Sequence, residues 1–193
     1  MIISKDHALL SLKVFHYLDE FHRLSPTEFE YLSGRVLSLL KVEEEYVTRS
    51  SGDQGIDFYG KVPFGEIIKP GVLTPGAEKN MKVWLVGQAK HYDATQVSTK
   101  DIRELVGSIS LAKSKIYAGS KDPLAQLQMR TCDPIFFLFF TTGSISKDAK
   151  DLLRRSGVVA MDGYQLAIFL ADNGIGSVND NFDPNVFRSW IGE

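Results

Sequence analysis

The sequence feature that most constrains the fold is residues 134–142, where Pro134 is followed by six consecutive apolar side chains and two threonines. Such a run is typical of a central β-strand that is covered on both faces. It is far shorter than the roughly 20 residues that a membrane-spanning helix needs. Other parts of the chain must therefore cover a sheet on both sides. With 193 residues, of which 44% are hydrophobic, the chain can form one such domain.

Three amphipathic helices are predicted before this strand. The second has the clearest start, because Ser25-Pro26-Thr27-Glu28 supplies an N-cap hydroxyl, a proline for the first turn and a capping-box glutamate. It is predicted to extend to about residue 41. The apolar stripes of the three helices are Leu9, Leu12, Phe15 and Leu18; Phe29, Leu32, Val36 and Leu40; and Ile102, Leu105, Val106, Ile109, Ala112 and Ile116.

The predicted strands fall into two groups. The first comprises residues 46–49, 56–60 and 81–89, and the second comprises residues 134–142 and 157–161. Strands of the first group follow one another through turns and a long Pro- and Gly-rich connection, as in an antiparallel meander. Those of the second group alternate with predicted helices at 146–156 and 164–172. We therefore expect an α/β fold with a mixed central β-sheet flanked by helices.

The composition excludes several classes of function. A net charge of -2 excludes a histone-like protein that binds polyanions by bulk charge. A single cysteine, Cys132, excludes an internal disulfide and a cysteine-based zinc site, so a reducing, cytoplasmic location is expected. Charged residues soon interrupt the apolar positions at the N-terminus, which argues against a signal peptide. No membrane role is expected.

Two polar segments lie at positions where polar side chains do not contribute to folding, which marks them as candidates for function. Residues 52–57 (GDQGID) combine two glycines with an aspartate at the start of a predicted strand. Residues 87–90 (GQAK) end a hydrophobic strand, and period-two alternation places Gln88 and Lys90 on one face. If the two strands pair as a hairpin, Asp57 converges with these two side chains.

This set of side chains suits metal-assisted hydrolysis of a phosphodiester. Asp57 would anchor Mg²⁺, which prefers oxygen ligands. Lys90 would stabilise negative charge on the phosphate or help to orient and deprotonate the attacking water. Glu30 could reach the metal from the second helix and restore charge that Gln88 lacks. Taken alone, however, the aspartates and glycines also fit a simple tight turn, and Asp53 either binds a second metal or fixes that turn.

Five short motifs, met in this order along the chain, carry a family resemblance. They are SPTEFE at 25–30, GDQGID at 52–57, QAK at 88–90, FTT at 140–142 and MDGYQL at 161–166. Together they resemble the Mrr-like restriction endonuclease domain of the PD-(D/E)xK nuclease superfamily. The resemblance implies a mixed sheet flanked by helices and magnesium-dependent endonucleolytic cleavage of DNA, often of modified or foreign DNA, as in restriction and defence.

The same resemblance implies a role for each site residue. Asp57 is the metal-binding aspartate, and Gln88 is the second metal ligand in the glutamine variant of the E-x-K element. Lys90 is the catalytic lysine, and Glu30 is the helical acidic residue. The implied cofactor is Mg²⁺, for which Mn²⁺ can substitute. DNA contacts are expected from five residues close to these motifs: Lys100, Arg103, His91, Thr141 and Thr142.

The resemblance also suggests boundaries and partners. We expect an N-terminal helical extension at 1–24, the nuclease domain at 25–175 and a C-terminal tail with a short helix at 176–193. The chain leaves no room for the separate DNA-recognition domain that many Mrr-type enzymes carry. The expected partners are therefore DNA, a second copy or larger assembly, and a recognition subunit.

Two rival functions remain open at this point. In the first, the chain is a DNA-binding module on a nuclease fold whose catalysis is weak or lost, because a neutral Gln88 lowers the affinity for a metal. In the second, the nuclease acts on RNA or branched DNA.

Overall fold

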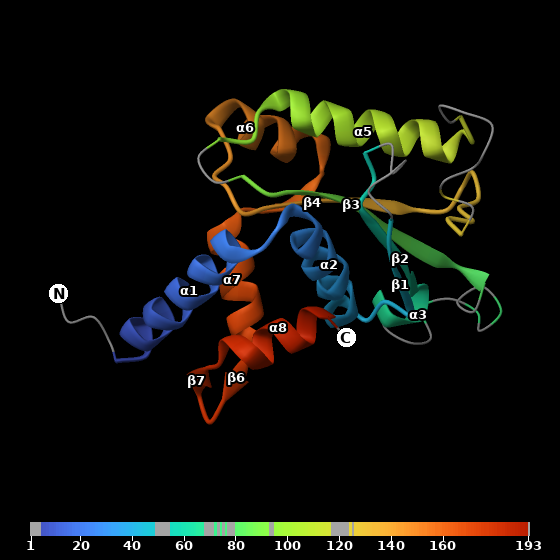
Figure 1. Ribbon diagram of the computed structural model, residues 1–193. Helices are drawn as coiled ribbons and strands as arrows, with labels where there is room; N and C mark the ends of the chain where they lie inside the picture. Colours follow the sequence, from blue (N-terminus) through green and yellow to red (C-terminus); the bar gives the residue numbers. More distant parts are fainter. Residues whose placement is uncertain are drawn as a thin grey trace.

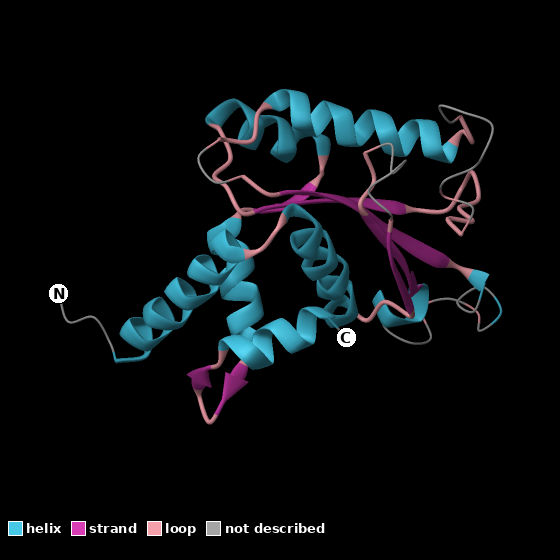
Figure 2. Cartoon of the chain, viewed as in Figure 1, coloured by secondary structure: helices cyan, strands magenta, loops and turns pink. Residues whose placement is uncertain are grey.

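The computed structural model describes residues 5–48, 55–67, 72, 74, 76, 80–92, 95–116, 124 and 126–192. Its centre is a five-stranded sheet in the order β1-β2-β3-β4-β5, with helices on both faces (Figure 1; Figure 2). The α/β fold with a mixed sheet is thus confirmed. The strands are β1 (Glu44–Val47), β2 (Phe58–Pro63), β3 (Lys82–Lys90), β4 (Ile135–Thr141) and β5 (Val159–Met161).

The sheet combines the two pairing modes expected from the sequence. β1, β2 and β3 pair antiparallel, whereas β3, β4 and β5 pair parallel. The parallel pairs are joined through helices, because a parallel connection must cross over to return to the same end of the sheet. The helices are α1 (Lys5–Arg23), α2 (Pro26–Val36), α3 (Phe64–Ile67), α5 (Thr99–Lys113), α6 (Lys147–Ser156), α7 (Gly163–Asp172) and α8 (Pro184–Gly192).

Two hydrophobic clusters cover the two faces of the sheet. On one face, α5 and α6 pack over Trp84, Val86 and Phe139. On the other face, α1, α2, α7 and α8 pack over Leu85 and Phe140. The capping box predicted at Ser25 is present, since Glu28 N–H donates to Ser25 Oγ at 3.2 Å and Ser25 N–H donates to Glu28 Oε2 at 2.7 Å. α2 ends earlier than predicted and continues as the 3₁₀ turn η1 (Leu37–Leu40).

The two ends of the chain pack together on the sheet. The Tyr17 hydroxyl on α1 donates to the carbonyl of Ile175, after α7. On α8, Arg188 Nε donates to Glu20 Oε2 at 2.8 Å, and the Glu20 residue is 4% exposed. The C-terminal tail also holds a short hairpin before α8, formed by β6 (Ser177–Val178) and β7 (Asn181–Phe182). The predicted extension and tail therefore contribute to the core cluster of the α2 face.

Three details of the predicted core are wrong. Ile116, assigned to the apolar stripe of the third helix, lies beyond the end of α5 and is 57% exposed. Phe15, assigned to the apolar stripe of the first helix, is 66% exposed, while Val14, Tyr17 and Phe21 are buried. The buried stripe is shifted by one residue, because α1 packs against α7 and the C-terminal hairpin as well as against the sheet. The apolar strand is also not covered along its whole length. β5 pairs with β4 only from Leu138 onward, and Phe136 is 48% exposed.

No helix in the described part of the chain is both long and apolar enough to cross a membrane.

Gly87 has less space for an added Cβ atom than any other described glycine, and this gives a stability prediction. A Cβ atom at this position would lie 2.3 Å from Cζ of Phe58, whose buried ring stacks on Phe140 with ring centroids 5.2 Å apart. We expect Gly87→Ala to lower the free energy of unfolding by about 1–3 kcal/mol, because the ring has no space into which to move. Urea denaturation measures the change.

A matched control is Gly107→Ala on α5, where a Cβ would meet nothing within 4 Å. We expect this variant to be as stable as the parent or more stable, by up to about 1 kcal/mol, because alanine favours the helix. Equal stability of Gly87→Ala and the parent would contradict the packing described here.

Candidate functional site

Three of the residues singled out in the sequence gather at one end of the β2–β3 ladder. Phe58 pairs with Gly87, so Asp57, the next residue outward, lies beside Gln88. Alternation along the strands places Asp57 on the same face as Tyr59, and it places Gln88 and Lys90 on the same face as Trp84. This is the face that α5 covers. The hairpin convergence expected from the sequence is therefore present in the fold.

Asp57 takes part in the ladder through its side chain as well as its backbone. Its N–H donates to the Gly87 carbonyl at 3.0 Å, and its Oδ2 accepts from the Ala89 N–H at 2.7 Å. The carboxylate thus accepts from the backbone where β2 begins, and the residue is only 5% exposed. These two bonds fix the orientation of the carboxylate beside Gln88.

Gln88 is the most unusual polar residue of the site. The residue is 1% exposed, and its Oε1 is a buried side-chain oxygen with no hydrogen-bond partner in the described part of the chain. Leaving such an acceptor unpaired costs about 1–3 kcal/mol. A bound cation or an ordered water would supply the missing partner.

Gly55 lies close to this amide. Its φ of +83° lies in the left-handed region, and a Cβ there would meet Ser108 Oγ at 2.5 Å and Gln88 Nε2 at 3.5 Å. The second glycine of the 52–57 segment is therefore required by both its backbone angle and its space. Asp53, the uncertain metal ligand, lies outside the described residues.

Lys90 lies under the first turns of α5. Its Nζ is 3.8 Å from Glu104 Oε1, and both side chains are partly exposed. Nearby, the Tyr92 hydroxyl donates to Asp101 Oδ1 at 3.0 Å. Asp101, Glu104 and Tyr92 were not among the site residues predicted from the sequence. The sequence did contain a signal for the two carboxylates. Positions 101 and 104 are one helical turn apart and flank the buried stripe of Ile102 and Leu105, which places them beside the face that α5 turns toward the sheet.

Glu30 lies on the other side of the sheet. It is half-buried on α2, one turn before Gly34, and a Cβ at Gly34 would lie 2.4 Å from Val47 Cγ2 on β1. α5 thus covers one face of the sheet, and α2 covers the other. No group of three or more His, Cys, Asp and Glu side chains in the described residues could hold a metal ion. A metal role for Glu30 stays a prediction.

A family comparison covers this whole set of residues. The sequence profile of the restriction endonuclease family Mrr_cat matches residues 21–118, just over half of the chain. This segment contains Glu30, Asp57, Gln88 and Lys90. The chain belongs to the Mrr family of restriction endonucleases. The family resemblance read from the five motifs is therefore confirmed, and the family is one of nucleases.

Solved structures give the same fold for this Mrr-family chain. The MspJI restriction endonuclease, in complex with a 27-mer oligonucleotide, matches 99% of the chain with a TM-score of 0.61 and 20% identity. The DNA modification-dependent restriction endonuclease AspBHI matches 100% of the chain with a TM-score of 0.56 and 17% identity. The chain spans only 37% and 42% of the lengths of these two proteins. No curated protein sequence matches it significantly.

The five expected DNA contacts of this nuclease domain divide into two groups. Lys100 and Arg103 are exposed near the start of α5, where a backbone phosphate could reach them. The other three are engaged within the protein. Thr141 Oγ1 accepts from Gly143 N–H at 3.1 Å, Thr142 Oγ1 accepts from Tyr92 N–H at 2.8 Å, and His91 Nε2 is 2.9 Å from the Phe21 carbonyl oxygen. A DNA role for these residues stays a prediction.

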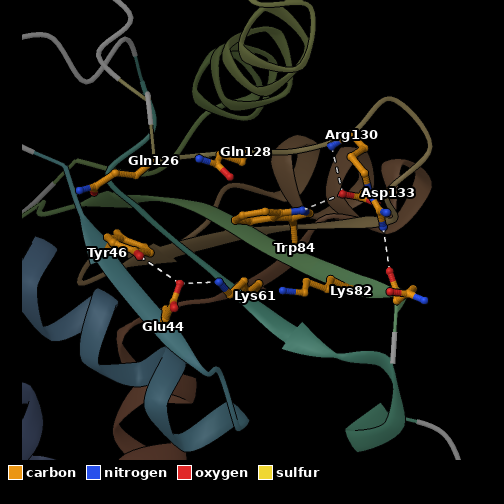
Figure 3. Close-up of a pocket in the computed structure, with 10 residues that line it drawn as sticks. Glu44, Tyr46, Lys61, Lys82, Trp84, Gln126, Gln128, Arg130 and Asp133 are labelled. Atoms are coloured by element: carbon orange, nitrogen blue, oxygen red, sulfur yellow. Dashed lines mark hydrogen bonds and ion pairs between the residues drawn. The ribbon is translucent and has the colours of Figure 1, made fainter. Parts of the chain in front are cut away.

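A polar cavity of about 510 Å³ lies toward the opposite end of β3 (Figure 3). None of the predicted site residues lines it. Its acidic side chains are paired within its wall: Glu44 with Lys61, and Asp133 with Arg130 at 2.7 Å and with Trp84 Nε1 at 3.2 Å. These contacts connect the strands to the segment before β4. The cavity is separate from the candidate site, because it shares no lining residue with it.

The Tyr92–Asp101 bond gives a pH prediction. Burial and the hydrogen bond to Asp101 raise the pKa of Tyr92 to about 12, from an ordinary value of 10.0. Because the pKa is higher in the folded protein, the stability that Tyr92 contributes is complete below pH 10.0 and is lost as the pH rises through about 12.

Ultraviolet absorbance of tyrosinate, recorded for the wild type and for Tyr92→Phe, measures this pKa. We expect the difference between the two titrations to have its midpoint near 12. A midpoint near 10.0 would contradict the buried bond.

Proposed function

We propose that this Mrr-family chain is a metal-dependent endonuclease that hydrolyses phosphodiester bonds in DNA. In this proposal Asp57 and Gln88 bind Mg²⁺, and Lys90 acts on the phosphate. The observation that carries the proposal is the buried Gln88 Oε1, which has no hydrogen-bond partner among the described residues. Gln88 is the neighbour of Asp57 at the end of the β2–β3 ladder.

The donor atoms fit a hard divalent cation. A carboxylate and an amide oxygen are ligands that Mg²⁺ accepts, and this ion usually keeps several waters beside one or two carboxylates. Mn²⁺, which prefers similar oxygen ligands, can substitute. When bound, the cation would act as a Lewis acid toward the phosphate and lower the pKa of a bound water.

The chain's own residues would perform the remaining tasks. The Ala89 N–H holds the Asp57 carboxylate in one orientation, so little reorganisation is needed when substrate binds. The Lys90 ammonium, on the same face, would stabilise negative charge on the attacked phosphate or orient the attacking water. Glu30, on α2, would add negative charge from the opposite side, as the resemblance implies.

We further propose that the substrate is modified or foreign DNA and that recognition lies elsewhere. The name of AspBHI describes dependence on DNA modification, and the chain corresponds to less than half of that protein. A net charge of -2 also disfavours tight binding to bulk DNA without help. A homodimer or a larger assembly with a recognition subunit, working in cytoplasmic defence, would meet these needs. Two copies would also allow both strands to be cut.

One observation favours a second candidate. Gln88 is neutral, and the described residues include no group of three acidic, His or Cys side chains that could hold a metal. A weakly binding site would leave a DNA-binding module on a nuclease fold. Calorimetric titration with Mg²⁺ in the presence of DNA separates the two candidates, because absence of binding favours the module.

Cleavage of supercoiled plasmid, methylated and unmethylated, tests the proposed function. We expect Asp57→Asn and Lys90→Ala to reduce the rate at least 100-fold, by roughly the factor typical of losing one charge-stabilising group. Asparagine is preferable to alanine at position 57, because its side-chain oxygen can still accept from the Ala89 N–H.

Lys82→Ala is the matched control, since Lys82 lies on the same face of the same strand at its opposite end. We expect this variant to cleave like the wild type. Full activity in Asp57→Asn or Lys90→Ala would refute the assignment of the site. A bias toward methylated plasmid would support modified DNA as the substrate.

A further inference from the structure

One face of α5 lies over the candidate site. Three polar side chains, at positions 101, 104 and 108, follow one another along this face at helical spacing. Ser108 lies beside Gly55, which in turn lies next to the Gln88 amide. Asp101 accepts a hydrogen bond from Tyr92, just beyond the end of β3. Glu104 is between them and is the residue that contacts Lys90. Its carboxylate is therefore held above the segment from Gln88 to Lys90.

The contact between Glu104 and Lys90 is weak for an ion pair. The distance of 3.8 Å exceeds that of a hydrogen bond, and the Glu104 side chain is 46% exposed. Exposed pairs of this kind contribute about 0–1 kcal/mol to stability. Glu104 can therefore exchange Lys90 for another cation at little cost.

Asp101 is less available for such an exchange. Burial alone would raise its pKa, but hydrogen bonds from the backbone and hydroxyl of Ser98 and from Tyr92, together with the charge of Lys90, lower it overall. The bond from the Ser98 backbone N–H is also part of the capping box that begins α5. Asp101 is a structural carboxylate, whereas Glu104 has one loose partner on this face.

The candidate metal site has less negative charge than a pair of acidic ligands would give it. Asp57 contributes one carboxylate, and Gln88, which occupies the position of an acidic ligand in the E-x-K element, contributes none. We propose that Glu104 supplies the second carboxylate of this site, directly or through a water. The proposal rests on the proposed function. The negative charge that was expected from Glu30 on α2 would then come from Glu104 on α5.

This assignment gives Glu104 a second effect. If its carboxylate turned toward a bound cation, the weak ion pair with Lys90 would be lost. The Lys90 ammonium would then be available to the phosphate.

The test is calorimetric titration of the whole chain with MnCl₂ in the presence of a short DNA duplex. We expect Glu104→Gln to weaken Mn²⁺ binding roughly tenfold, as typically follows loss of a group that supports a metal site. Glu66→Gln is the matched control. Glu66 is equally exposed at 49% and pairs with Lys41 at 3.1 Å, but it lies on α3, beyond the far end of β2. We expect its Mn²⁺ affinity to equal that of the wild type.

A second variant, Asp57→Asn, separates failure of this inference from failure of the proposed function. If Asp57→Asn loses Mn²⁺ affinity and Glu104→Gln keeps it, the function stands and the role of Glu104 is refuted. The same conclusion follows if Glu104→Gln slows cleavage but binds Mn²⁺ normally, since Glu104 would then only position Lys90. If the wild type binds no Mn²⁺, both proposals fail.

Discussion

The candidate site depends on one hydrogen bond, from the Ala89 N–H to the Asp57 carboxylate. Asp57 directly precedes β2, and its side-chain oxygen accepts the hydrogen bond from this β3 N–H. Through this bond the ladder fixes a buried carboxylate beside Gln88 and on the face of Lys90. The sheet therefore supplies the rigidity that a catalytic group needs, and Gly55 lies close to the glutamine amide.

The helices on the two faces then determine the electrostatics of the site. α5 brings Glu104 to Lys90 and Asp101 to Tyr92, whereas α2 carries Glu30 on the opposite face. Because Gln88 is neutral, Asp57 is the one carboxylate that the β2–β3 ladder brings to the site among the described residues. A helix can supply further negative charge, and α5 carries Glu104, whose Oε1 lies 3.8 Å from Lys90 Nζ.

Much of this arrangement could be predicted from the sequence, because its signals are local. The capping box at Ser25, the glycine at 55 and the alternation from Trp84 to Lys90 each depend on neighbouring residues. The pairing modes followed from whether turns or helices join the strands. The contacts of Glu104 and Asp101 could not be predicted, because they depend on how α5 crosses the sheet. The exposure of Phe15 and Phe136 likewise depends on packing between distant elements.

The central claim is that Asp57 and the buried Gln88 oxygen bind a divalent cation together. Anomalous diffraction from crystals soaked in Mn²⁺ tests it most directly, since it locates the ion without requiring activity. The account predicts one anomalous peak in direct contact with the Asp57 carboxylate and Gln88 Oε1. A peak only at other residues, with Gln88 Oε1 hydrogen-bonded to protein, would contradict it.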